Sequence, residues 1–139
     1  MSKTIIGYTT GVFDLFHIGH LNILKRAKEQ CDYLIVGVST DELVKTYKNK
    51  IPVISFEERC EIVKAIRYVD EVVSQTSMDK MEAWEKLHFD VMFHGDDWKG
   101  SEMYKEIQEK FDRVGCKLIF LPHTSGTSST EIVKKIKDK

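Results

Sequence analysis

The sequence predicts an α/β fold in which a doubly wound, mostly parallel sheet is flanked by helices. Strand-like and helix-like segments alternate along all 139 residues, and the connections between them are short. Residues 33–38 (YLIVGV) are apolar at nearly every position, which is typical of a parallel strand covered by helices on both faces. Because the length suits a single core, we expect residues 1–139 to form one domain.

The first half of the chain contains two strands separated by a helix. Residues 4–9 are β-branched and apolar, which indicates a strand. In residues 18–30 the apolar side chains recur three positions apart with charged residues between them, which predicts an amphipathic helix. After the strand at 33–38, the S-x-x-E spacing of residues 39–42 predicts the start of a short helix. The lysine-rich residues 45–53 are then predicted to form a mobile loop.

The second half continues the alternation. We predict helices over residues 55–66, 78–87 and 101–114 and strands over residues 71–73, 90–94 and 116–121. Ser128 and Glu131 have the spacing of a further capping box, which predicts a C-terminal helix. In such a sheet ligands bind beyond the carboxyl ends of the strands, so the turns after the strands are where chemistry is expected.

Composition excludes several classes of protein. With 21 basic and 22 acidic residues the net charge is −1, which gives no sign of a non-specific nucleic-acid binder. No apolar run approaches the roughly 20 residues that span a bilayer, and no signal peptide is recognisable. The cysteines (Cys31, Cys60 and Cys116) are odd in number and lack C-x-x-C spacing, which indicates buried thiols in a reducing compartment. We therefore expect a soluble cytoplasmic protein with neither nucleic acid nor membrane as a partner.

Two histidines follow the first predicted strand. His17 and His20 are three residues apart at the start of a helix, so their side chains project from nearly the same face. Gly19 between them would let a ligand approach the backbone, and the free N–H groups of a helix start favour anions. A structural pair is the alternative. Zinc would need a third ligand, and none lies at a recognisable spacing, so we predict no protein-held metal.

The residues around these histidines resemble a known motif. Gly11-x-Phe13-Asp14-x-x-His17-x-Gly19-His20 is similar to the G-x-F-D-x-x-H-x-G-H motif of the nucleotidylyltransferase superfamily. Further segments, in the same order, resemble its cytidylyltransferase branch: residues 67–72 (RYVDEV), 95–98 (GDDW) and 124–129 (TSGTSS). GDDW is similar to the glycerol-3-phosphate enzymes in particular. These segments spread over nearly the whole chain.

The resemblance implies a Rossmann-like fold and transfer of CMP from CTP to a small phosphorylated alcohol, with Mg²⁺ accompanying CTP and a homodimer as the assembly. Glycerol 3-phosphate is the first acceptor expected, giving CDP-glycerol and pyrophosphate, a precursor for cell wall or capsule. Val12 and residues 33–43 resemble the choline-phosphate enzymes instead, so choline or ethanolamine phosphate is the second. Adenylyl transfer to a cofactor precursor and a non-catalytic nucleotide sensor remain alternatives.

The resemblance also implies roles for individual residues. His17 and His20 hold the triphosphate and donate hydrogen bonds, and Lys50 and Arg67 complete the catalytic set. Lys48 and Lys80 are the candidates for binding the acceptor. The further nucleotide-binding candidates are Val12, Phe13, Gly19, Asp97, His123, Thr124, Gly126, Ser128, Ser129 and Thr130.

Plainer interpretations exist for the basic residues. The two loop lysines could be merely solvated, and Arg67 could form a surface salt bridge with Asp70 or Glu71. Arg59 is a weaker basic candidate. His123 stands where the family has arginine, and His88 and His94 have no assigned role.

Overall fold

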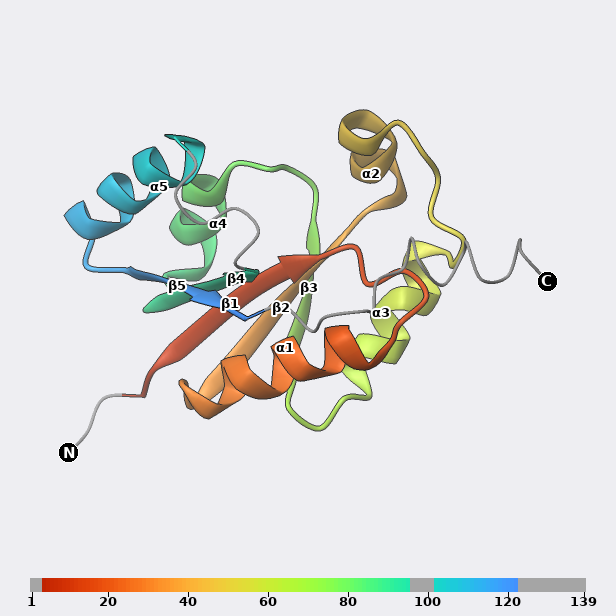
Figure 1. Ribbon diagram of the computed structural model, residues 1–139, viewed down its shortest axis with the longest axis horizontal. Coiled ribbons are helices and arrows are strands. Elements are labelled where there is room, and N and C mark those ends of the chain that lie inside the picture. Colours follow the sequence, from red (N-terminus) through yellow and green to blue (C-terminus); the bar gives the residue numbers. More distant parts are fainter. Residues whose placement is uncertain (1–3, 96–101, 123–139) are drawn as a thin grey trace.

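The computed structural model describes residues 4–95 and 102–122, apart from the side chain of Lys48. Within these residues five strands form one sheet in the order β3-β2-β1-β4-β5 (Figure 1). All four strand pairings are parallel, as predicted. The strands are β1 (Ile6–Gly11), β2 (Tyr33–Ser39), β3 (Glu71–Gln75), β4 (Val91–Gly95) and β5 (Lys117–Leu121).

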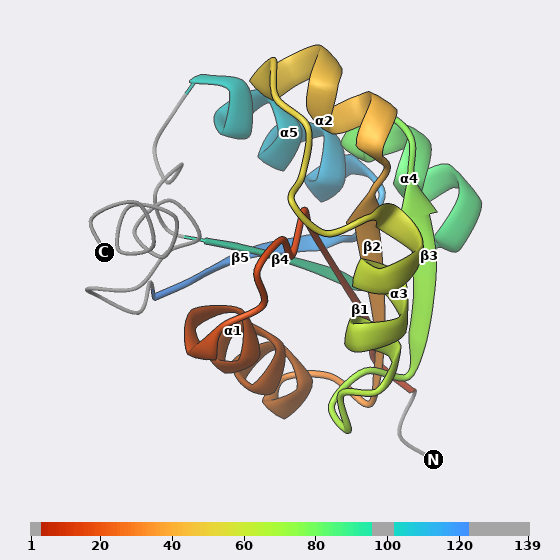
Figure 2. The same ribbon diagram turned by 90° about the vertical axis from the view of Figure 1, so that its right-hand side faces the viewer.

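Helices cover both faces of the sheet. They are α1 (Ile18–Glu29), α2 (Asp41–Lys48), α3 (Phe56–Lys64), α4 (Lys80–Leu87) and α5 (Glu102–Arg113). Figures 1 and 2 show α1 and α3 on one face, α4 and α5 on the other, and α2 near the end of β2. The doubly wound arrangement predicted from the sequence is therefore confirmed.

Strand β2 explains why the sheet has two cores. Its alternate side chains Leu34, Val36 and Val38 belong to the cluster that packs against α1 and α3. Ile35 faces the other way and joins the cluster with Phe89 and residues of α4 and α5. A strand buried on both faces has no polar side, and this is what its continuous apolar run indicated.

The boundaries of several elements differ from the predictions. The first strand runs two residues later than expected, and α2 is capped by Thr40, whose side chain accepts from the Leu43 N–H at 3.2 Å. The predicted loop over residues 45–53 is wrong in its first half, because α2 continues through Lys48 and ends at Asn49 in the left-handed conformation. Lysine is a good helix former, and a lysine-rich stretch does not by itself mark a loop. The predicted C-terminal helix lies outside the described residues.

The structure also describes the cysteines and the lengths of the apolar helices, which the composition addressed. All three cysteines are free thiols, although only Cys116 is fully buried. In the parts of the chain that the structure describes, no helix is long and apolar enough to cross a membrane.

The order of the strands locates the site. Strands β1 to β3 proceed outward in one direction from β1, whereas β4 lies on the other side of β1. The chain therefore changes direction between β1 and β4, and a crevice opens at the carboxyl ends of these two strands.

Candidate active site

A pocket of about 190 Å³ lies at this change of direction, between the carboxyl ends of β1 and β4, the start of α1 and the segment after α2. Four of the residues predicted to form the site line it: Val12, Phe13, His20 and Lys50. Asp14, from the same motif, also lines it. The sequence motif and the fold therefore indicate the same place.

The two histidines form the N-terminal cap of α1. His17 is the capping residue, and its Nδ1 accepts a hydrogen bond from the Gly19 N–H at 3.0 Å. In return, His20 Nδ1 accepts from the His17 N–H at 3.2 Å. This is a capping box built from imidazoles instead of hydroxyl and carboxylate groups. The centres of the two rings are 3.9 Å apart.

This capping geometry assigns the protons of both rings. A backbone N–H can only donate, so each Nδ1 must be an unprotonated acceptor, and the proton of the neutral imidazole is on Nε2. The hydrogen-bond donor of each neutral ring is therefore its Nε2–H group. Gly19 differs from the expectation, since it is buried and its N–H is already donated to His17. That amide is not offered to a ligand.

The turn between β1 and α1 has an unfavourable backbone conformation. Phe13 and Leu15 have φ angles of 56° and 49°, a region that residues with side chains seldom adopt. Such conformations cost on the order of 1–3 kcal/mol each and persist where the surroundings enforce them. Phe13 is buried, and its ring meets that of His20 edge-on at 5.4 Å. A Cβ at Gly11 would lie 3.0 Å from the Phe13 ring, so a side chain there would fit only if that buried ring shifted.

Asp14 ties the segment after Lys50 to this turn. Its two carboxylate oxygens accept hydrogen bonds from the backbone N–H groups of Val53 and Ile54, at 2.8 and 2.9 Å. Lys50 itself is exposed and lines the pocket. The predicted basic loop is therefore anchored beside the histidines.

Arg59, on α3, has a role that sequence reasoning missed. Its side chain is 0% exposed and donates hydrogen bonds to the backbone carbonyls of Ile54, Val12 and Ser39 at 2.7–2.9 Å. It also pairs with Asp41 at 2.5 Å. The guanidinium joins the ends of β1 and β2, the start of α2 and the loop before α3. A signal was available, because Arg59 lies four residues before Val63 on the buried face of α3.

The structure does not bring Arg67 to the pocket. Arg67 precedes β3 and so lies at the amino edge of the sheet, where it is exposed and donates to the Tyr68 hydroxyl at 3.0 Å. The pocket of a single chain does not include Arg67, so its predicted contact with the phosphates stays a prediction. The alternative, a salt bridge with Asp70 or Glu71, is not found either. Asp70 pairs instead with Lys28, and Glu71 accepts from a tyrosine hydroxyl on β2.

Lys80, the other acceptor candidate, is also absent from the pocket lining. It is the first residue of α4 and is 5% exposed, and burial lowers the pKa of its ammonium group to about 8.

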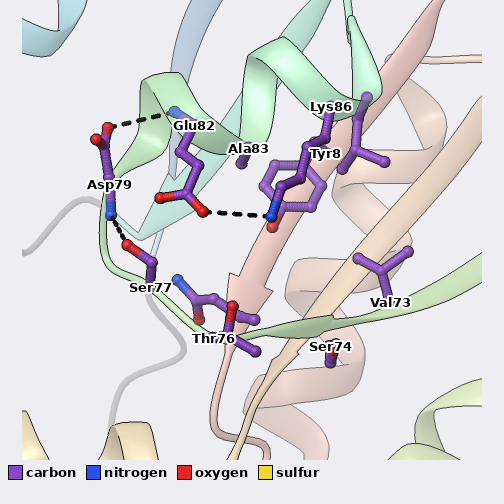
Figure 3. A pocket seen from close by; sticks show the side chains of 11 residues that line it. Tyr8, Val73, Ser74, Thr76, Ser77, Asp79, Glu82, Ala83 and Lys86 are labelled. Carbon is purple, nitrogen blue, oxygen red and sulfur yellow. Dashed lines mark hydrogen bonds and ion pairs between the residues drawn. The ribbon is translucent and has the colours of Figure 1, made fainter.

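A second hollow of about 400 Å³ lies beside α4 (Figure 3). There the Asp79 carboxylate accepts from the Glu82 N–H, and the Glu82 side chain pairs with Lys86 at 3.2 Å. It is the larger of the two hollows, but none of the predicted site residues lines it. Size therefore does not identify the site.

The remaining predicted residues lie outside the described part of the structure. These are the side chain of Lys48 and all of Asp97, His123, Thr124, Gly126, Ser128, Ser129 and Thr130. Of the described candidates, the structure brings together the histidines, Val12, Phe13 and Lys50.

Comparisons with known proteins indicate one family. The pattern of the cytidylyltransferase-like family matches residues 8–135. The chain is 39% identical to the glycerol-3-phosphate cytidylyltransferase of Bacillus subtilis (strain 168), over 96% of this chain and 97% of the relative. It is 38% identical to the FAD synthase of Pyrococcus abyssi (strain GE5 / Orsay), over 96% and 91% of the two chains. The crystal structure of the lipopolysaccharide core biosynthesis protein from Thermoplasma volcanium GSS1 superposes with a TM-score of 0.73 at 28% identity, covering 88% of this chain and 98% of that one.

Proposed function

The chain belongs to the cytidylyltransferase-like family, and on that premise we propose that it transfers CMP from CTP to glycerol 3-phosphate. The products are CDP-glycerol and pyrophosphate. The observation that carries the proposal is the imidazole capping box at the switch point of the sheet. It holds the two imidazoles side by side at a helix start, and His20 lines the pocket together with Lys50. The match to a glycerol-3-phosphate cytidylyltransferase over nearly both full lengths supports the choice of acceptor.

The reaction requires alignment and charge stabilisation more than proton transfer. An oxygen of the acceptor phosphate attacks the α-phosphorus of CTP. The bond from that phosphorus to the bridging oxygen breaks, and pyrophosphate leaves with the electron pair. Because the attacking oxygen is already anionic near neutral pH, no general base is needed. The Nε2–H groups of His17 and His20 donate to the α-phosphate as charge accumulates in the transition state.

Lys50 and Asp14 act together in this scheme. The ammonium group of Lys50 attracts the phosphates of the reactants, and Asp14 holds the segment that follows the lysine against the histidine turn. Lys48, at the end of α2, is the second cation proposed for the acceptor.

Mg²⁺ is proposed to enter with the nucleotide. Among the described residues there is no cluster of three metal-binding side chains, and both oxygens of Asp14 are engaged by backbone N–H groups. This donor set suits an ion held mainly by triphosphate oxygens and water, which is how Mg²⁺ commonly binds beside phosphates. When bound, the ion neutralises part of the charge of the triphosphate.

One experiment tests the function and its rivals. The purified protein is incubated with CTP or ATP and with each of glycerol 3-phosphate, ethanolamine phosphate, choline phosphate and FMN. Pyrophosphate release and the mass of the linked product are measured. We expect CDP-glycerol from CTP. The similarity to an FAD synthase makes adenylyl transfer the second candidate, and a preference for ATP with FMN would overturn the proposal in its favour. Tight CTP binding without any product would indicate a nucleotide sensor.

We also propose a cytoplasmic homodimer. Strand β3 is at the edge of the sheet, and exposed apolar side chains lie on α3 and the loop before it: Ile51, Val53 and Ile62 are 72%, 69% and 37% exposed. Exposed apolar patches beside a sheet edge favour association with another chain. Sedimentation analysis of the wild type and of Val53→Glu tests this, and an unchanged monomer in both would overturn it.

A further inference from the structure

His94 is a titratable residue of the pocket to which no motif assigned a role. It lies near the carboxyl end of β4 and lines the pocket together with Gly95. Strand β4 pairs with one edge of β1, and β2 pairs with the other edge. The segment that carries Lys50 follows β2 and α2, so it approaches β1 from the side opposite to β4. His94 and Lys50 therefore border the pocket from different directions.

Tyr104, in the first turn of α5, holds the imidazole of His94. The tyrosine hydroxyl is 2.7 Å from Nε2, and the two ring centres are 4.8 Å apart. Tyr104 is 3% exposed, and its own ring meets Phe120 edge-on at 5.8 Å. Burial raises the pKa of Tyr104 to about 12, so the hydroxyl keeps its proton at all ordinary pH values.

The contacts of the second nitrogen define the tautomer of His94. Nδ1 lies 3.2 Å from the backbone carbonyl oxygen of Gly95, which can only accept. A neutral ring that donates from Nδ1 then accepts the Tyr104 O–H at Nε2. Both nitrogens are thus engaged by the protein, and what the ring can offer a ligand in the pocket is its flat carbon face.

We infer that His94 contacts the nucleoside half of the bound nucleotide through its ring face, and that Tyr104 is the residue that positions it. The inference rests on the proposed function, since it takes a nucleotide as the substrate. The triphosphate is drawn to the histidine cap of α1, and the acceptor to the lysines beyond β2. The β4 side of the pocket is left for the sugar and base. An aromatic face stacks on any base, so His94 contributes affinity and does not select among bases.

Nucleotide binding measured by calorimetry tests this, with tripolyphosphate as a probe that lacks a nucleoside. His94→Ala should weaken CTP binding about tenfold, the effect of losing one stacking partner, and leave tripolyphosphate binding unchanged. Tyr104→Phe should weaken CTP binding by about threefold, the effect of one hydrogen bond that orients the ring. The KM for the acceptor should stay at its wild-type value in both variants.

A double variant and a matched control separate positioning from general damage. His94→Phe combined with Tyr104→Phe restores a flat ring without an unpaired hydroxyl, and should bind CTP more tightly than His94→Ala. Tyr8→Phe removes the hydroxyl of a second tyrosine, which is 2% exposed and stacked on Phe89 away from this pocket. It should bind CTP as the wild type does.

The outcomes are distinct for the two proposals. Equal CTP affinity of wild type and His94→Ala would overturn the inference, and so would an equal loss of tripolyphosphate binding. If the wild type instead binds and turns over ATP, the proposed function fails. The same variants then test His94 with ATP, because stacking does not depend on the base.

Discussion

The carboxylate of Asp14 accepts a hydrogen bond from the backbone N–H of Ile54 at 2.9 Å, although the two residues are 40 positions apart in the sequence. The neighbouring N–H of Val53 occupies the other carboxylate oxygen at 2.8 Å. One side chain of the histidine turn thus sets the position of the loop that follows Lys50. The placement of the cation and of the imidazoles is coupled through Asp14.

Asp14→Asn tests whether this coupling affects catalysis independently of its effect on the stability of the fold. An amide keeps one acceptor oxygen and loses the charge, so one of the two charge-assisted hydrogen bonds is lost, costing about 1.5–3 kcal/mol in kcat/KM. Asp32→Asn is the matched control, because Asp32 also accepts a backbone N–H, that of Ile5, at the amino edge of the sheet. Steady-state kinetics and thermal unfolding are measured for both. Equal kinetic losses in the two variants would show that Asp14 has no special connection to the site.

His17→Ser should distinguish the capping role of the histidine from its catalytic role. Serine is a good N-cap and can accept the N–H groups that His17 Nδ1 now accepts, so the Tm should change little. The Nε2–H donor is lost, and kcat should fall by about 10²–10³. His17→Ala should lose both. If His17→Ser retains activity within a few-fold of the wild type, the imidazole serves only as a cap.

Lys80→Met should change how stability depends on pH. Burial lowers the pKa of this ammonium group from 10.5 to about 8. Below pH 8 the group is charged in both folded and unfolded chains, and the folded state bears the full cost of burying the charge. Between pH 8 and 10.5 only the unfolded chain retains the proton, so the free energy of unfolding of the wild type rises with pH.

Methionine has no ionisable group, so the Lys80→Met variant lacks this pH dependence of stability. Lys80→Met should therefore be more stable than the wild type at pH 7, by up to about 3 kcal/mol, and the difference should shrink as pH rises through that window. Urea unfolding at pH 7, 8.5 and 10 measures it. Lys86→Met replaces an exposed lysine of the same helix and is the control for the loss of a lysine side chain. If the difference in unfolding free energy between Lys80→Met and the wild type were the same at all three pH values, the lowered pKa of Lys80 would be contradicted.

Arg59→Met should be among the more damaging substitutions on α3. It removes the donors to three backbone carbonyls and leaves Asp41 without its partner, which should cost about 3–5 kcal/mol of unfolding free energy. Arg67→Met replaces an exposed arginine and should change stability by less than about 0.5 kcal/mol. Similar unfolding curves for the two variants would show that the buried guanidinium is dispensable.

The fold and the centre of the site could be predicted because they depend on local patterns. The apolar run of β2 indicated a two-sided core, and the spacing of His17 and His20 placed both on one turn of helix. Their tautomers could not be predicted, since these depend on backbone N–H directions that exist only in the folded turn. The contacts of Asp14 and Arg59 join distant segments, and no periodicity in the sequence encodes such pairs.

The position of Arg67 outside the pocket follows from the topology of the sheet. A residue that precedes a strand of a parallel sheet lies at the amino edge, and the rule that located the site excludes that edge. Resemblance to the family supplied the motif and its order but not the side of the sheet. Within one chain this motif lies away from the pocket, and the predicted contact of Arg67 with the phosphates stays a prediction.

The pairing of β1 with β4 also determines when the site can form. The Thr9 hydroxyl donates to the Phe93 carbonyl across a separation of 84 residues, whereas β1 and β2 are joined by a single helix. Closing so long a loop costs chain entropy, and contacts of high sequence separation form slowly. The N-terminal strands can pair while the chain is still being synthesised, but the pocket has no second wall until β4 has been made. Nucleotide binding would therefore report the last stage of folding, and a refolding experiment that follows CTP binding should lag behind the recovery of helical signal.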